Sequence, residues 1–337
     1  MKVTKSSALP SLARTGESHR PIVTVALVQT RWHEDAAEHD ATIENGVRLA
    51  AEGGATAVFL PELTLSRYPA DAMPIGDAQA TAEELESGPT LALARRLAQK
   101  YGVCVHASLF EKNPSDAVRG LNTAILVAPG GEVVGRTRKL HIPVTEGYFE
   151  DQYFAPGPAG DGSLQSEAYP VYPVDLGNGS ATFGLPTCWD EWFPEVAREY
   201  SLRGAEILVY PTAIGSEPDH PEFDTQPLWQ QVIVGNGIAN GTFMVVPNRY
   251  GFEGSLTFYG SSFISDPYGR VLAKASRDQD EVLIAELDLD QRGDWLKLFP
   301  FLATRRPDTY GLQTKPVTNP RVFGGEGAQG GIPGVAQ

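Results

Sequence analysis

The sequence predicts a layered α/β fold with helices outside and sheets facing one another. Three observations support it: short β-rich apolar runs alternate with segments of helical periodicity, several neighbouring strands are joined by hairpin turns, and the apolar runs continue without a break between the two halves. With 337 residues and 42% hydrophobic content, the chain is long enough for one large domain or two small ones.

In the first half of the chain, short strands are expected with helices between them. The run IVTVAL at 22–27 is typical of a strand buried on both faces, and residues 41–52 follow with apolar side chains at helical spacing. The next expected elements are strands at 57–60, 103–109 and 121–127 and a helix at 90–101. Gly130 and Gly131 mark a hairpin turn after the last of these strands.

The second half continues the alternation after a Pro/Gly-rich loop at 155–163. Pro194 begins a predicted helix that ends at Gly204, and another helix, weakened by two internal glycines, is expected at 228–240. The expected strands of this half are 172–175, 180–185, 207–210, 243–247, 259–265 and 281–287.

Composition divides the chain into three parts. Residues 1–20 have a basic start but no apolar middle, so a disordered leader is expected rather than a signal peptide. Residues 21–315 form the predicted folded domain, with no sign of a separate cofactor domain, and residues 316–337 form a Gly-rich tail that is expected to be mobile.

The net charge of −15 argues against a nucleic-acid partner, which normally requires a clustered basic face. No apolar stretch approaches the length of a membrane span, so no membrane partner is expected. Two cysteines in a chain this long make no disulfide framework. We therefore expect a cytoplasmic protein whose thiols are reduced.

Three polar side chains follow predicted strands, where the active sites of α/β proteins lie. Glu62 follows the run AVFL in FLPELTLSRYP, and Lys139 ends a basic hairpin strand in RTRKLHIP. Cys188 stands in ATFGLPTCWDEWFPE, where a strand breaks at Pro186 and a helix follows. A strand-to-helix elbow of this kind exposes a nucleophile to a pocket.

Of the two cysteines, Cys188 is the better candidate nucleophile. Its neighbours are polar and aromatic, whereas Cys104 lies inside the strand YGVCVHASLF and is expected to be a packing residue. A Cys-His protease is an alternative because His141 lies near a motif, although the usual local signatures are absent. A buried carboxylate with a raised pKa can serve as the base instead. No pair of histidines or cysteines has metal-ligand spacing, so no metal is expected.

In this order, the three segments resemble the Glu-Lys-Cys triad of the nitrilase, or carbon-nitrogen hydrolase, superfamily. The resemblance runs from about Ile22 to Leu312, and CWDEWFPEVAREYSLRGAEILVYPTAIGSEP is its most specific segment. The branch that it most resembles is the N-carbamoylputrescine amidases, which RKLHIP, GYFEDQYFAPG, NRYGFEGSLTFYGSSFI and FPFLATRRPDTYGL also match. The resemblance implies a four-layer αββα sandwich that assembles into a homodimer or a larger homo-oligomer.

The resemblance also implies a role for each residue of the triad. Cys188 would attack the substrate carbonyl, Lys139 would contact the oxyanion, and Glu62 would be the general base and acid. The backbone N–H of Trp189 is the expected second oxyanion donor. No metal or organic cofactor is implied.

A second glutamate is expected beside the lysine. Glu150, in GYFE, falls where the family places the glutamate that orients the lysine and the incoming water. Glu146 is a nearby rival, although it does not match the family's motif.

The expected substrate is a small molecule with a non-peptide amide or an N-carbamoyl amine, such as N-carbamoylputrescine. Asp190, Glu191 and Trp192 form an acidic and aromatic set near the cysteine that suits a linear cationic amine, so they are the predicted substrate contacts. The segment PELTLSRYP departs from that branch, which often has a glutamine before the glutamate. The alternatives are an aliphatic amidase or nitrilase acting on a small amide or nitrile and, more distantly, a non-catalytic binding member of the same fold.

Overall fold

A computed structural model describes residues 1–318 and residue 322 of the chain. The chain divides into two compact units, of which the first is Met1–Phe299 and the second begins at Pro300. The first unit contains both large sheets and every candidate site residue, and it ends earlier than the predicted domain boundary at residue 315. The predicted tail at 316–337 lies almost entirely outside the described residues.

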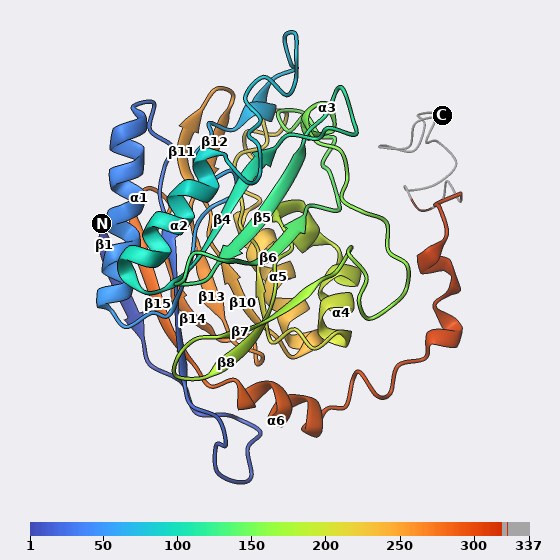
Figure 1. Ribbon diagram of the computed structural model, residues 1–337. Coiled ribbons are helices and arrows are strands. Elements are labelled where there is room, and N and C mark those ends of the chain that lie inside the picture. The colour runs from blue at the N-terminus through green and yellow to red at the C-terminus, as the bar shows by residue number, and fades with distance from the viewer. Residues whose placement is uncertain (319–321, 323–337) are drawn as a thin grey trace. The chain divides into compact units, whose positions relative to one another are not determined.

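The first unit contains two large sheets (Figure 1). The seven-stranded sheet has the order β1-β15-β2-β3-β4-β5-β6 and the six-stranded sheet has the order β14-β13-β10-β9-β8-β7. The strands of the first sheet are β1 (Lys2–Ser6), β15 (Glu281–Leu287), β2 (Val23–Gln29), β3 (Ala57–Phe59), β4 (Cys104–Glu111), β5 (Leu121–Val127) and β6 (Val133–Arg138). Those of the second are β14 (Val271–Lys274), β13 (Phe263–Ser265), β10 (Phe243–Val246), β9 (Ile207–Val209), β8 (Ser180–Gly184) and β7 (Val171–Asp175). A separate hairpin pairs β11 (Tyr250–Glu253) with β12 (Leu256–Tyr259).

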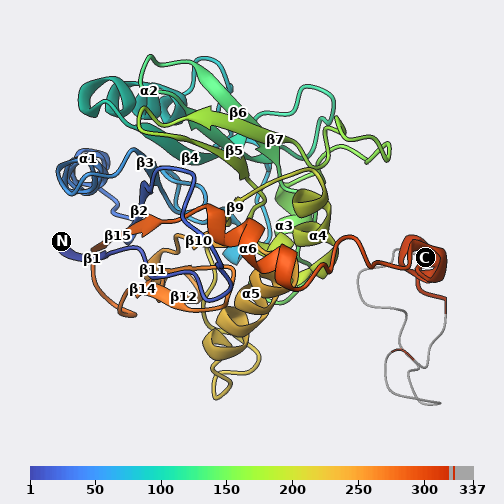
Figure 2. The same cartoon turned by 90° about the horizontal axis from the view of Figure 1, so that it is seen from below.

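Helices cover the outer face of each sheet, on opposite sides of the sandwich (Figure 2). The helices α1 (Ala36–Glu52) and α2 (Pro89–Tyr101) pack on the seven-stranded sheet, and α4 (Pro194–Leu202) and α5 (Gln226–Asn240) pack on the six-stranded sheet. The other α-helices of this unit are α3 (Glu150–Tyr153) and α6 (Asp290–Leu298). The prediction of a four-layer αββα sandwich is therefore confirmed. No helix among the described residues has the length and apolar character needed to cross a membrane.

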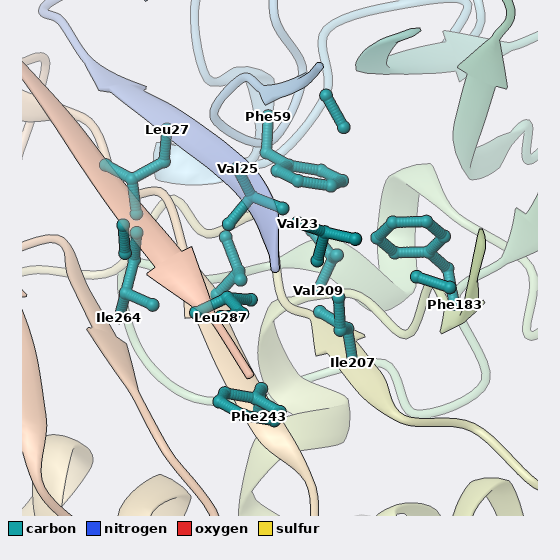
Figure 3. Packing of buried hydrophobic residues seen from close by; sticks show 14 of the residues in the cluster. Val23, Val25, Leu27, Phe59, Phe183, Ile207, Val209, Phe243, Ile264 and Leu287 are labelled. Carbon is teal, nitrogen blue, oxygen red and sulfur yellow. The ribbon is translucent and has the colours of Figure 1, made fainter. Parts of the chain in front are cut away.

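The space between the sheets is filled by apolar side chains from both of them (Figure 3). Because successive side chains of a strand point to opposite faces, Val25 and Leu27 of β2 enter this inter-sheet core. Ala26 and Val28 of the same strand face α1 and α2. Because both faces of β2 are buried, its sequence is a nearly continuous apolar run, and the prediction of a strand buried on both faces is confirmed.

The prediction that residues 1–20 form a disordered leader is wrong. The strand β1 pairs in parallel with β15, and the segment after it is held by side chains of the first unit, for example by the ion pair between Arg14 Nε and Asp294 Oδ2 at 2.9 Å. The backbone N–H of His19 also donates to Asp290 Oδ2 at 2.6 Å. An edge strand of this kind is held by backbone hydrogen bonds and has polar, mostly exposed side chains, so it carries no apolar signal in the sequence.

The single strand expected at 259–265 is also wrong, because the chain turns between β12 and β13. Gly260 and Ser261 have φ values of 55° and 60°, in the left-handed region that interrupts a strand. The turn separates the hairpin strand β12 from β13 in the six-stranded sheet.

Candidate active site

Glu62, Lys139 and Cys188 follow β3, β6 and β8, and the fold brings these three strand ends to one edge of the sandwich. In the first sheet, β3 runs parallel to β4, and β6 runs parallel to β4 as well because β5 is antiparallel to both β4 and β6. The C-terminal ends of these strands therefore lie together. Glu62 also accepts a hydrogen bond from the backbone N–H of Ala213, which follows β9 of the second sheet, at 2.8 Å.

The turn that carries Cys188 is a five-residue 3-10 helix, Cys188–Trp192, which we call the cysteine turn. Thr187 and Asp190 form a capping box at its start, and Pro194 then begins α4. Cys188 has a φ of 43°, which is rare for a residue other than glycine, and its N–H donates to Pro211 O at 3.0 Å. The expected strand-to-helix elbow is therefore present and strained, as is common at active sites.

Lys139 is the centre of a buried ionic cluster. Its side chain is 0% exposed, and Nζ lies 3.0 Å from Glu62 Oε1 and 2.6 Å from Glu150 Oε2. Asn122 Nδ2 donates to Glu62 Oε1 at 2.7 Å, so that the carboxylate is held by three donors when the backbone N–H of Ala213 is included. One buried ammonium thus contacts two buried carboxylates.

The second glutamate beside Lys139 is Glu150, at the start of α3. Its Oε2 accepts from Lys139, and its Oε1 accepts a hydrogen bond of 2.8 Å from the hydroxyl of Tyr68, which is buried. Glu146 is exposed. The geometry therefore places Glu150, and not Glu146, in the cluster.

Burial and charge act together on the proton affinities of this cluster. Burial lowers the pKa of Lys139, but the negative charges of Glu150 and Glu62 outweigh burial and raise it well above its ordinary value. Burial raises the pKa of Glu150 to about 7, against the lowering effect of Lys139. Burial and the charge of Glu62 raise the pKa of Cys188 well above its ordinary value, while Lys139 lowers it. The charges of Glu62 and Lys139 therefore act in opposite directions on the thiol of Cys188.

A cavity of about 260 Å³ opens onto the cysteine turn. Cys188, Trp189 and Trp192 form one part of its wall, together with Glu150. The remaining lining residues are Pro143, Thr145, Tyr148, Ala213, Ile214, Glu217, Phe223, Thr225 and Leu228. None of the side chains that line this cavity is basic.

Glu217 is a candidate site residue that the sequence analysis missed. It lies in the loop between β9 and α5, lines the cavity, and accepts a hydrogen bond of 3.1 Å from the hydroxyl of Thr225. Burial raises its pKa. The available signal was its position in the segment IGSEP, which follows a predicted strand just as the triad residues do.

Asp190 was predicted to contact substrate, but the structure places it outside the wall of this cavity. Its carboxylate is 1% exposed and is absent from the cavity wall. Oδ1 accepts from the backbone N–H and the Nδ1 of His141 at 2.9 and 2.7 Å, and Oδ2 accepts from the N–H of Thr187 at 3.0 Å. Asp190 therefore joins the cysteine turn to the segment that follows Lys139.

Glu191 was also predicted to contact substrate, but it is completely buried and is not among the residues that line the cavity. Its Oε1 accepts a hydrogen bond of 2.7 Å from Trp229 Nε1 of α5. The structure therefore gives Glu191 a contact with α5 in place of a position on the cavity wall. Of the three predicted contacts, Trp192 lines the cavity.

His141 does not serve Cys188 as a protease histidine would. Its ring stacks on Phe193 with centroids 3.8 Å apart, and its Nδ1 is engaged by Asp190. Within the described residues, no group of three or more His, Cys, Asp or Glu side chains has a geometry that could hold a metal ion. Cys104 is buried in the inter-sheet core, where packing was expected.

The model of the carbon-nitrogen hydrolase family matches residues 24–297 of this chain. The chain therefore belongs to the carbon-nitrogen hydrolase family, in the nitrilase superfamily, and is a hydrolase of carbon-nitrogen bonds other than peptide bonds. The family prediction made from the sequence is confirmed.

Two curated relatives match most of the chain. It is 36% identical to a citrullinase of Francisella tularensis over 86% of this chain and 96% of that protein. It is 35% identical to an N-carbamoylputrescine amidase of Arabidopsis thaliana over 87% of this chain and 96% of that protein. A crystal structure of a carbon-nitrogen hydrolase from Helicobacter pylori is 31% identical, with a TM-score of 0.77 over 88% of this chain and 99% of that one.

Proposed function

We propose that this enzyme hydrolyses an N-carbamoyl derivative of a cationic amine, such as N-carbamoylputrescine, through a covalent intermediate on Cys188. The observation that carries the proposal is the charge of the cavity. Glu217 is a carboxylate on its wall, and none of the lining side chains is basic. A substrate with one carbonyl to be attacked and one distant ammonium group suits this arrangement.

The first half of the reaction would use the cluster as it stands. Glu62 takes the thiol proton, and the sulfur of Cys188 attacks the substrate carbonyl to form a tetrahedral oxyanion. The ammonium of Lys139 and the backbone N–H of Trp189 stabilise this oxyanion, and one such donor typically lowers the barrier by about 3 kcal/mol. Glu62 then returns the proton to the departing amine or ammonia, which leaves an acyl or carbamoyl thioester on the sulfur.

The second half would reverse the roles of the same groups. Glu62 takes a proton from water as the water attacks the thioester carbonyl, and the thiol of Cys188 leaves with that proton. Glu150 would act mainly through Lys139, because its carboxylate, which also accepts from the hydroxyl of Tyr68, contacts the ammonium on one side while Glu62 contacts it on the other. None of these steps uses a cofactor.

The size of the cavity favours a short, linear substrate. Its volume of about 260 Å³ is at the lower end of small-molecule sites, which typically measure about 300–1,000 Å³. Trp189, Trp192 and Leu228 provide an apolar wall along which an aliphatic chain could lie. The carbamoyl group would then meet Cys188 at one end, and the ammonium group would meet Glu217.

The two curated relatives have different names but nearly equal identity, so similarity alone does not choose between their substrates. Charge does provide a reason. The α-carboxylate of citrulline would enter a cavity that offers it no basic side chain, and an unpaired carboxylate is costly to bury. N-carbamoylputrescine has no such group, and the proposal would place the enzyme in polyamine metabolism.

A panel of three ureas of similar length tests the proposal. We expect the highest kcat/KM with cationic N-carbamoylputrescine, a lower value with neutral N-pentylurea, and the lowest with zwitterionic citrulline. Release of both ammonia and carbon dioxide would identify a carbamoyl substrate, whereas a simple amide or nitrile would yield ammonia and a carboxylic acid. A preference for citrulline, or for nitriles and simple amides, would contradict the proposal.

Glu217→Gln is the matched variant, because glutamine keeps an acceptor for Thr225 and removes the charge. We expect KM for N-carbamoylputrescine to rise about tenfold or more, since a hydrogen bond to a charged group is lost, while KM for N-pentylurea changes little. An equal effect on both substrates would show that Glu217 is not the ammonium contact.

We also propose that the enzyme is a cytoplasmic homodimer or larger homo-oligomer, as the resemblance implied. Sedimentation at micromolar concentration tests the assembly, and a pure monomer would contradict it.

A further inference from the structure

The cysteine turn contains a buried acid that the proposed mechanism does not use. Glu191 follows Cys188 by three residues and is 0% exposed. Its Oε1 accepts from Trp229 Nε1, whereas Oε2, although buried, has no hydrogen-bond partner among the described residues. This environment differs from that of Glu62 and Glu150, which share the ammonium of Lys139.

We propose that Glu191 is a positioning residue that works as a neutral carboxylic acid, holding the cysteine turn on α5 and keeping a further negative charge away from Cys188. The inference deepens the proposed function, because it rests on Cys188 as the nucleophile. Its geometric basis is that, among the described residues, a single neutral N–H donates to a carboxyl group that is sealed from water. An ionised carboxylate would require a cation or several donors in that position.

Two hydrogen bonds attach the cysteine turn to α5 through Glu191. Trp229 Nε1 donates to its side chain at 2.7 Å, and Asn236 Nδ2 donates to its backbone carbonyl at 3.0 Å. Both donors belong to the buried face of α5. Because Cys188 has a positive φ, its backbone conformation must be maintained by contacts elsewhere, and these two bonds lie at the other end of the same short turn.

Several charged and titratable groups lie around Glu191, whereas the contacts from α5 are the neutral side chains of Trp229 and Asn236. The charged and titratable groups are Cys188 and Asp190 of its own turn, Glu62 after β3, Lys139 after β6, Tyr210 after β9 and Tyr259 of β12. Lys139 is the one cation in this set, and it already serves two carboxylates. Burial, the largest effect, accordingly raises the pKa of Glu191 well above its ordinary value.

Ionisation of Glu191 would oppose the reaction. A negative charge on Glu191 raises the pKa of Cys188, so the thiolate becomes harder to form. The same charge would destabilise the oxyanion that develops beside the sulfur. The wild-type enzyme should therefore lose activity on the alkaline side as Glu191 gives up its proton.

Glu191→Gln tests this directly, because an amide has the shape of the neutral acid, keeps an acceptor for Trp229 and cannot ionise. At neutral pH we expect kcat and KM within about threefold of wild type. The alkaline limb of the kcat profile should extend to higher pH than in wild type. Glu191→Ala, which loses the anchor, should lower kcat by roughly tenfold or more with less effect on KM, since a small displacement of a nucleophile is costly.

Alkylation by iodoacetamide gives a readout that is independent of turnover. The rate measured at the peptide that contains Cys188 reports its thiolate, and its pH dependence should differ between wild type and Glu191→Gln in the alkaline range where Glu191 ionises. A merely structural role would leave this dependence unchanged. If Glu191→Gln does not fold, Trp229→Phe keeps a packed ring and removes the donor, and its alkaline limb should also move to higher pH.

A folded Glu191→Gln enzyme with kcat more than tenfold below wild type at neutral pH would overturn the inference, because a charge would then be required. So would unchanged alkaline limbs for both turnover and alkylation. Failure of the underlying proposal is distinguishable, since it would appear as residual activity in Cys188→Ala and not in the variants of Glu191.

Discussion

The inter-sheet core and the ionic cluster around Lys139 are both sealed from solvent, but burial has opposite consequences in them. In the core, removal of side chains such as Phe243 and Leu27 from water is itself stabilising, at about 25 cal/mol per Å² of apolar surface. In the cluster, burial of Lys139, Glu62 and Glu150 is unfavourable and is offset by their contacts with one another and by further hydrogen-bond donors to the two carboxylates. The core should therefore govern stability, and the cluster should govern activity.

The largest expected effect is a loss of activity, with little change in stability, on substitution of the cysteine beside the cluster. Cys188→Ala should lower kcat by roughly 10⁴-fold or more, because no other group can supply the attacking atom. The free energy of unfolding should change by less than about 1 kcal/mol, since a single sulfur atom is lost. Ammonia release and urea unfolding measure the two quantities. Retention of more than a small fraction of the activity would refute the assignment of the nucleophile.

The next largest effect is a loss of stability, with little change in kcat, on substitution of a side chain in the inter-sheet core. Phe243 begins β10, at the end of the strand remote from the site, and is 1% exposed. Phe243→Ala should reduce the free energy of unfolding by about 3–5 kcal/mol, because it leaves a cavity in a close-packed core. In urea unfolding this appears as a lower midpoint, while kcat at a temperature where the variant is folded should stay near wild type. A large fall in kcat in the folded variant would mean that core and cluster are not independent.

Lys139→Ala should affect both quantities, and it therefore sharpens the comparison. The rate constant kcat should fall by roughly 10²-fold or more with a smaller change in KM, because the oxyanion contact is felt chiefly in the transition state. Stability should also become more dependent on pH. The pKa of Glu150 is already raised to about 7, and loss of the ammonium would raise it further.

The sign of that pH dependence follows from proton binding. Between its unfolded value near 4.5 and its folded value, Glu150 binds more protons in the folded state, so stability falls as pH rises through this window. In Lys139→Ala the window should extend above pH 7, which melting temperatures from pH 5 to 9 would show. Melting temperatures that rise over this range would contradict the cluster as described.

The smallest effect is the control for Lys139. Arg136→Ala should stay within about 0.5 kcal/mol of wild type in stability and near normal in kcat, because Arg136 is an exposed residue of β6, the strand that precedes Lys139. Arg138 is next to Lys139, and successive side chains of a strand point to opposite faces, but Arg138 is still a poorer control. It pairs with the buried Glu111 at 2.6 Å, so its removal would leave a carboxylate without its partner. Equal damage from Lys139→Ala and Arg136→Ala would show that the oxyanion role is wrong.

Elements with a local signal could be predicted from the sequence. The strands at 121–127 and 281–287 were predicted with the bounds that the structure has, because apolar runs and flanking turn residues identify them. Glu62, Lys139 and Cys188 were found because each follows such a strand in a recognisable motif. The edge strand β1 was missed because its side chains are mostly exposed and polar, so that backbone pairing alone reveals it.

The chain by itself therefore determined the strands and helices that have a local signal, the family and the three residues of the proposed triad, since these depend on periodicity, turn chemistry and local motifs. Only the tertiary structure decided what each side chain faces. It joined Glu62 to the backbone of Ala213, placed Glu217 on the cavity wall, and buried Asp190 and Glu191 in the protein, outside that wall. These outcomes depend on contacts between residues far apart in the chain, which no local pattern records because they form only when the two sheets pack together.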